Sequence, residues 1–149
     1  MPEHSRWRKP NAMALLIGDV YECAAVLRAA GERMAAAEGQ THARFHALTV
    51  IADSPRSVPA IARRLGVSRQ NLQRIANDLL REGLVEQIPN PDHRSSPLLR
   101  LTESGNETLE RFARRADAYN RALNLTPSRV AQLRESLAEL TDHARQITE

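Results

Sequence analysis

The chain has 149 residues, of which 42% are hydrophobic and 26% charged, and its net charge is +3. This composition is typical of one folded domain or two small lobes, and it excludes a wholly disordered chain. The single cysteine excludes an intramolecular disulfide framework, and no segment approaches the ~20 apolar residues of a membrane helix. We therefore expect a cytoplasmic protein with no membrane association.

The first part of the chain is predicted to be helical. Residues 1–11 contain two prolines and charges of both signs, and we expect them to form an extended arm. Apolar residues then recur at steps of three and four from residue 13 to about 38, which predicts a long amphipathic helix. A second helix is predicted for residues 41–52, with Phe45 and Leu48 facing inward.

Two shorter helices are predicted for residues 57–65 and 68–81. Ser57 and Ser68 are expected to cap them, and Gly66 lies between them. A glycine at this place permits the left-handed turn that joins the two helices of a helix-turn-helix. The spacing therefore indicates this motif.

The remainder of the chain is predicted to form a hairpin and two helices. Apolar strands at 84–88 and 98–101 flank the turn residues at 89–92, a pattern typical of a β-hairpin. The last two helices, 102–123 and from 126 onward, each begin at a threonine that can cap them. A hairpin directly after a helix-turn-helix predicts a winged helix.

The helix predicted for residues 68–81 separates apolar from polar side chains. At 100° per residue, its apolar face consists of Leu72, Ile75, Ala76, Leu79 and Leu80. The opposite face carries Gln70, Arg74, Asn77 and Arg81, and Ser68, Arg69 and Asn71 lie at the start of the helix. Arginine, glutamine and asparagine have the donors and acceptors that read guanine and adenine in the major groove.

Positive charge is concentrated in the same segment. Residues 55–81 contain six arginines and one acidic residue, a net charge of +5 against +3 for the whole chain. A charge stripe of this kind can simply be a solvated helix face. Together with the helix-turn-helix spacing, it favours DNA binding.

Four motifs resemble the multiple-antibiotic-resistance regulator (MarR) family. They are IARRLGVS at 61–68, LLREGLV at 79–85, NPDHR at 90–94 and LTESG at 101–105. The resemblance implies a dimeric transcription factor, most often a repressor released by a small molecule or an oxidant. It also implies that Arg94, at the wing tip, enters the minor groove and that Asp92 helps to orient the wing.

These arguments predict a mainly α fold, a winged helix-turn-helix carried on a helical dimerisation bundle. Residues 41–102 are assigned to the DNA-binding region, and residues 12–40 and 103–149 to the dimerisation region. The predicted DNA contacts are Ser68, Arg69, Gln70, Asn71, Gln73, Arg74, Asn77, Asp92, His93 and Arg94. We expect a homodimer that binds a pseudo-palindromic site on double-stranded DNA.

The last helix carries a heptad seam that suits a helix–helix interface. The predicted dimerisation residues are Leu16, Val20, Val130, Leu133, Leu137, Leu140 and Ile147. The alternative is that this seam packs against the first helix of the same chain.

Three weaker features leave alternatives open. Cys23 lies on the apolar stripe of the first helix, which favours core packing over redox sensing. His42 and His46, four residues apart, are too few for a metal site and favour the polar lining of a cleft for an aromatic or phenolic effector. Phosphate loops and catalytic motifs are missing from the sequence, so neither a cofactor nor an enzyme is expected. A winged helix that binds only protein is the remaining alternative.

Overall fold

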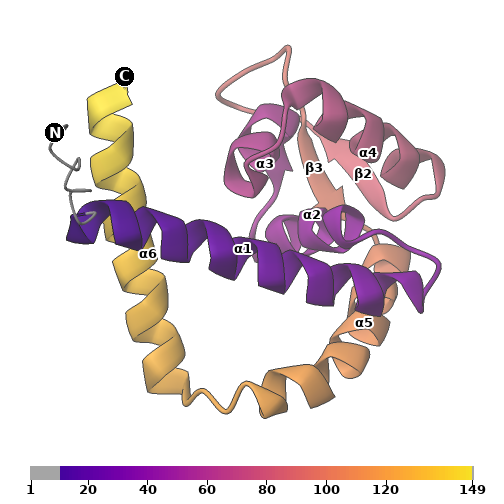
Figure 1. The fold of residues 1–149 in the computed structure, drawn as a ribbon. Coiled ribbons are helices and arrows are strands. Elements are labelled where there is room, and N and C mark those ends of the chain that lie inside the picture. Colours follow the sequence, from indigo (N-terminus) through magenta and orange to yellow (C-terminus); the bar gives the residue numbers. More distant parts are fainter. Residues whose placement is uncertain (1–10, 149) are drawn as a thin grey trace, which may run out of the picture. The chain divides into compact units, whose positions relative to one another are not determined.

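The computed structural model describes residues 11–148, and this part contains six helices and three short strands. In chain order they are α1 (Ala12–Ala36), α2 (His42–Asp53), β1 (Arg56–Ser57), α3 (Val58–Leu65), α4 (Arg69–Arg81), β2 (Val85–Ile88), β3 (Leu98–Leu101), α5 (Glu103–Ala122) and α6 (Pro127–Thr148) (Figure 1). The mainly α winged-helix prediction is confirmed. Most of the arm predicted for residues 1–11 lies outside the described residues. Its last residue, Asn11, caps α1 by accepting a hydrogen bond from Ala14 N at 2.7 Å.

The chain divides between Phe112 and Ala113 into two compact units, so α5 belongs to both. The first unit has its core where α2, α3, α4 and the sheet meet, and its largest fully buried side chains are Phe45, Leu48, Ile61, Leu72, Leu79 and Leu99. Phe45 and Leu48 face inward as predicted. The first half of α5 joins this unit through Phe112, whose ring stacks on Phe45 with centroids 3.9 Å apart.

The sheet is antiparallel, with the strand order β1-β3-β2. In the hairpin, Glu86 pairs with Arg100 in register, and their side chains form an ion pair of 2.7 Å. The third strand, β1, was not predicted, because two residues are too short to show alternation. Ser57 is the N-cap residue of α3, as predicted, but its side chain makes no capping hydrogen bond, and the residue pairs with Leu98 in the sheet.

The turn between α3 and α4 follows the prediction closely. Gly66 ends α3 in the left-handed conformation with φ of 68°, and its N–H donates to the carbonyl of Ala62. Ser68 caps α4, because its hydroxyl accepts a hydrogen bond of 3.1 Å from Asn71 N. These two devices fix the angle at which α4 leaves the turn.

The start of α5 is locked onto the turn that precedes β2. The Thr102 hydroxyl donates to the carbonyl of Gly83 at 2.6 Å, and Thr102 N donates to the carbonyl of Leu84 at 3.1 Å. The same hydroxyl caps α5 by accepting from Gly105 N at 3.1 Å. A Cβ at Gly105 would stand 2.0 Å from the Leu84 oxygen, so this position needs a glycine. The LTESG motif at 101–105 is therefore a structural lock between helix and hairpin.

Most residues of α1 and α6 are exposed in the single chain. The buried residues of α1 are Ala30, Gly31 and Ala35, all in its C-terminal half, and α6 has none. Cys23 is exposed, so its predicted packing in the core is wrong. The reason is that the apolar stripe of α1 continues beyond the part that α2 covers. Within residues 11–148, no helix is long and apolar enough to cross a membrane.

Candidate nucleic-acid interface

The helix α4 presents its polar residues to solvent and its apolar residues to the core. Leu72, Ala76 and Leu79 are buried. The exposed side is formed by Arg69, Gln70, Gln73, Arg74, Asn77 and Arg81, whereas Asn71 is half-buried. The separation of faces predicted from the sequence thus places the arginine, glutamine and asparagine side chains together on one accessible surface.

Side-chain hydrogen bonds link neighbours along this polar surface. Arg74 Nη2 donates to Asn71 Oδ1 at 3.0 Å, one helical turn earlier. Gln73 Nε2 donates to Asn77 Oδ1 at 2.9 Å, one turn later. Such pairs at spacings of three and four are neighbours on a helix surface and restrict each other's rotamers. The surface is therefore partly ordered before any partner arrives.

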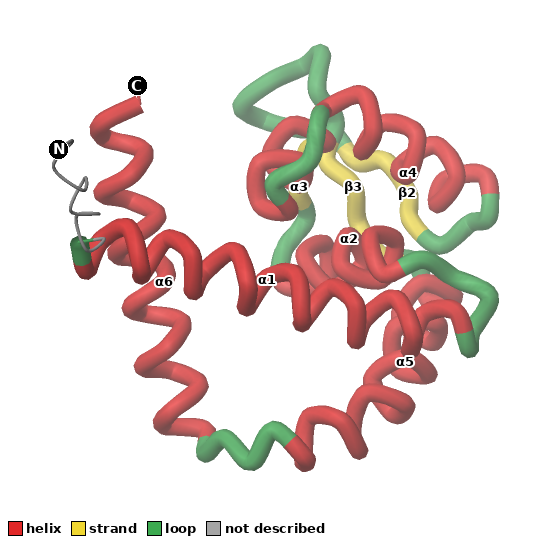
Figure 2. The backbone as a smooth tube through the Cα atoms, viewed as in Figure 1, coloured by secondary structure: helices red, strands yellow, loops and turns green. Residues whose placement is uncertain are grey.

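The wing is the loop of residues 89–97 between β2 and β3 (Figure 2). Asn90 holds it together: Asn90 Nδ2 donates across the loop to the Ser96 carbonyl at 2.8 Å, and Asn90 Oδ1 accepts from Asp92 N at 3.1 Å. Asp92, His93 and Arg94 are all exposed beyond this clasp. Asn90 was not among the predicted site residues. The turn sequence Asn-Pro-Asp was the signal for it, because asparagine side chains commonly bond the backbone two residues on.

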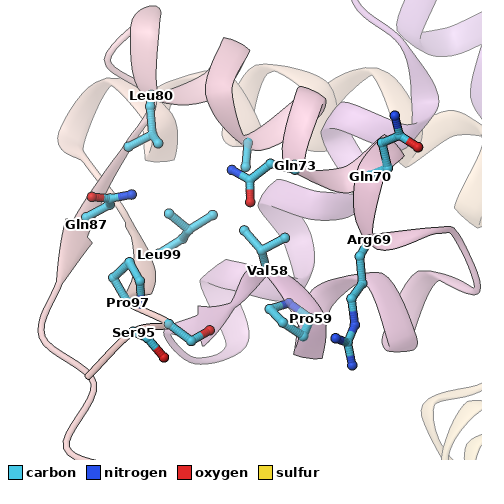
Figure 3. A pocket seen from close by; sticks show the side chains of 12 residues that line it. Val58, Pro59, Arg69, Gln70, Gln73, Leu80, Gln87, Ser95, Pro97 and Leu99 are labelled. Atoms are coloured by element: carbon cyan, nitrogen blue, oxygen red, sulfur yellow. The ribbon is translucent and has the colours of Figure 1, made fainter. Parts of the chain in front are cut away.

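A groove of about 440 Å³ separates α4 from the wing. Figure 3 shows Gln73 pointing toward its centre over Val58 and Leu99, with Arg69 at one end and Ser95 at the other. The floor is apolar, and the polar side chains at its rim are Arg69, Gln70, Gln73, Gln87, Ser95 and Ser96. The groove thus brings three predicted contacts beside the base of the wing. It does not include Asp92, His93 or Arg94, and its wing residues Ser95 and Ser96 were not predicted.

The positive charge of this region is unevenly neutralised. Of the six arginines between residues 55 and 81, Arg56 pairs with Asp53 at 3.0 Å and Arg81 pairs with Asp78. Within the part of the chain that the structure describes, the other four have no carboxylate partner; they are Arg63, Arg64, Arg69 and Arg74. The unpaired charge therefore lies at the end of α3 and on the first half of α4, beside the groove.

The two histidines lie together on α2, with ring centroids 5.5 Å apart. Partial burial lowers the pKa of His46, and the nearby charges of His42 and Arg64 lower it further. Gly31 of α1 allows His42 to pack closely, because a Cβ at Gly31 would stand 2.0 Å from the His42 ring. Among the described residues, the histidines form no cluster of three metal-ligating side chains. Their role as a ligand-cleft lining stays a prediction.

The predicted dimerisation residues are accessible in the single chain. Leu16 on α1, and Val130, Leu133, Leu137 and Ile147 on α6, are exposed, while Val20 and Leu140 are half-buried. The exposed side chains of Val130, Leu133, Leu137 and Ile147 lie at heptad positions along α6 and form an apolar surface that a monomer would leave in water.

The chain matches a family model and has relatives among known proteins. A model described as "MarR family" matches residues 39–94. An uncharacterised protein of Mycobacterium tuberculosis is 47% identical over 132 residues, which cover 87% of this chain and 92% of that protein. The transcriptional activatory protein BadR of Rhodopseudomonas palustris is 35% identical over 98 residues, covering 63% of this chain and 56% of BadR.

Solved structures of other regulators share the fold. A MarR family transcriptional regulator of Streptomyces coelicolor matches with a TM-score of 0.68 at 23% identity, covering 92% of this chain and 98% of that chain. The transcriptional regulator MosR of M. tuberculosis, solved in a complex with DNA, matches with a TM-score of 0.65 at 23% identity. The match covers 88% of this chain and 96% of that chain. The family model spans the helix-turn-helix and the wing tip, and the shared fold extends to the flanking helices. Residues 39–94 therefore belong to the MarR family, and the chain as a whole has the winged-helix fold of a solved MarR family transcriptional regulator.

Proposed function

We propose that this protein binds double-stranded DNA as a homodimer and regulates transcription. The observation that carries the proposal is the exposed face of α4, on which arginine, glutamine and asparagine side chains stand beside a groove and a wing. A helix of this kind fits the major groove, where these residue types distinguish bases. The relationship to BadR, a transcriptional activatory protein, supports the same class of function.

Two parts of the surface have different tasks in this proposal. The α4 residues Gln70, Gln73 and Arg74 read base edges, whereas the unpaired arginines beside them neutralise phosphates. The wing carries Arg94 to the minor groove, where the base pattern is degenerate and the contact adds affinity more than sequence preference. The groove between α4 and the wing accommodates the sugar-phosphate strand between these two contacts.

Dimerisation supplies the second half of the binding site. The proposed interface consists of Leu16 and Val20 of α1 and the heptad residues of α6, which are Val130, Leu133, Leu137, Leu140 and Ile147. Two-fold symmetry then requires a pseudo-palindromic operator with half-sites about 34 Å apart, one turn of DNA. Changing Leu133 and Leu137 together to Asp places unpaired charges in that interface, and we expect monomer in sedimentation. A dimer of unchanged mass would contradict this role for α6.

Regulation is proposed to be repression relieved by a small aromatic or phenolic effector. The pair His42 and His46 is the proposed polar lining of the effector site. A ligand acts there only if its affinity differs between the DNA-bound and the free conformation. DNA must then lower the affinity for the ligand by the same factor by which the ligand lowers the affinity for DNA. The exposure of Cys23 favours a second possibility, in which an oxidant acts on this thiol.

A winged helix that binds only protein is the competing function. The four arginines without carboxylate partners favour DNA, because a protein-binding surface needs no such excess of positive charge. Selection of genomic fragments by the purified protein, followed by footprinting, separates the two functions. Binding of no fragment at low salt would overturn the proposal.

The footprinted site then allows the α4 and wing contacts to be tested separately. Arg74→Ala should lose about 1–3 kcal/mol of binding free energy and relax base preference at one position. Arg94→Ala should weaken binding to all DNA sequences more evenly. It should also reduce the slope of log affinity against log salt concentration by about 1. Arg100→Ala is the matched control, since Arg100 pairs with Glu86 and does not line the groove. If the Arg74 and Arg94 variants both bind like the Arg100 variant, the proposed docking surface is incorrect.

A further inference from the structure

The Arg74 side chain is tethered within α4 by one neighbour. Its Nη2 donates to Asn71 Oδ1 at 3.0 Å, and among the described residues this is the only hydrogen bond or ion pair that the Arg74 guanidinium makes. Arg74 is exposed, so without this bond its four side-chain torsions would be free to sample solvent conformations. The bond therefore decides where the guanidinium stands in the free protein.

We propose that Asn71 is a positioning residue, which orients Arg74 for base reading before DNA arrives. This inference rests on the proposed DNA-binding function. It also changes the role expected for Asn71 from the sequence, where it was counted among the residues that touch DNA. In the proposal Asn71 acts through Arg74.

The surroundings of Asn71 fit a positioning role. Asn71 is half-buried, and its backbone N–H is fixed by the Ser68 cap at 3.1 Å, so its backbone and side chain have little freedom. One of the two lone pairs of its side-chain oxygen accepts the bond from Arg74. The paired acceptor–donor contact by which asparagine reads adenine would have to share this oxygen with the Arg74 guanidinium, which already sets the orientation of the carboxamide.

The tether leaves Arg74 able to bind DNA. A guanidinium has five N–H donors, and the bond to Asn71 uses one of them. Four donors remain, and two are enough for a bidentate contact with guanine O6 and N7. The side chain is uncharged, so Asn71 orients Arg74 without neutralising the positive charge that attracts DNA. An aspartate at this position would hold the guanidinium and neutralise it.

The gain from this arrangement is entropic. A long side chain that is already ordered loses less freedom on binding, and ordering such a side chain typically changes affinity by roughly two- to tenfold. The gain applies only where Arg74 makes a fixed contact. Asn71→Ala should therefore weaken binding to the footprinted site by that factor, with almost no change for random-sequence DNA. If Asn71 had only a structural role, the substitution would weaken binding to both DNAs equally.

A double-mutant cycle on the footprinted site tests whether Asn71 acts through Arg74. The four proteins are the wild type, Asn71→Ala, Arg74→Ala and the double variant. We expect the loss caused by Asn71→Ala to disappear in the Arg74→Ala background. If the same loss persists there, Asn71 contacts DNA itself and the positioning role is wrong.

A measurement on the free protein gives a second readout. The NMR order parameter of the Arg74 Nε–H bond should fall in Asn71→Ala. The matched control is Asn77→Ala, the same substitution in the same helix at a residue bonded to Gln73; it should leave Arg74 unchanged. Both substitutions place alanine in a helix, so neither is expected to unfold it.

The outcomes separate this inference from the proposed function. An unchanged order parameter, or an additive cycle in a protein that binds its site, overturns the positioning role and leaves DNA binding intact. Failure of the wild type to bind any DNA overturns the proposed function as well, whatever the NMR result.

Discussion

Gly105 offers a sharp test of the lock between α5 and the hairpin. It lies in the first turn of α5 without a positive φ, where replacing glycine by alanine ordinarily stabilises a helix by up to about 1 kcal/mol. The structure predicts the opposite sign. A Cβ here would stand 2.0 Å from the Leu84 carbonyl oxygen, against at least 3.4 Å for an ordinary contact.

The cost of Gly105→Ala follows from what must move. Overpacking against backbone typically costs about 1–3 kcal/mol. Moving α5 away also stretches the hydrogen bonds from Thr102 N to the Leu84 carbonyl and from the Thr102 hydroxyl to the Gly83 carbonyl, each with a net contribution of about 0.5–1.5 kcal/mol. After subtraction of the alanine gain, we expect a net destabilisation of about 1–5 kcal/mol.

Urea unfolding at one fixed protein concentration measures this effect. The matched control is Gly18→Ala in α1, because a Cβ at Gly18 meets nothing within 4 Å. At 100° per residue, Gly18 also lies on the side of α1 opposite to Leu16 and Val20. The control should be as stable as the wild type or more stable by up to about 1 kcal/mol. If Gly105→Ala is as stable as the control, α5 does not approach Leu84 closely and the reasoning is refuted.

Three further predictions concern stability. The pKa of His46 is lowered on folding, so the native state favours its neutral form; the contribution to stability should be complete above the ordinary pKa of about 6.5 and decrease as the pH falls below it. The substitution His46→Gln should flatten the pH profile of thermal unfolding, and an unchanged profile would show that another group titrates. Glu82→Gln removes the carboxylate paired with Arg44, whose side chain is only 15% exposed, and should cost about 1 kcal/mol in urea unfolding. Gly66→Ala should lower the free energy of unfolding by about 1–2 kcal/mol, because Gly66 has a φ of 68° and the space around it is open, so the effect comes from the backbone alone; Gly66→Asn should lower it less. Equal stability of the wild type and both variants would contradict a strained turn.

Local sequence signals were sufficient for most of the elements of this protein. The helix spacing around Gly66, the Ser68 cap and the turn residues of the wing all act over a few positions along the chain. Each of these features depends on backbone conformation or on helix periodicity, which neighbouring residues determine. The polar face of α4 could be predicted for the same reason, because a face is a property of one helix.

Contacts between distant segments were decided only by the tertiary structure. The strand β1 exists because β3 lies beside it, and Ser57, the N-cap residue of α3, pairs there with Leu98. The apolar stripe of α1 predicted a buried Cys23, but a periodic pattern specifies only which face is apolar and not how far along the helix a partner covers it. Helix periodicity by itself makes Gly105 an ordinary helix position. Only the approach of Leu84, 21 residues earlier in the chain, makes glycine necessary there.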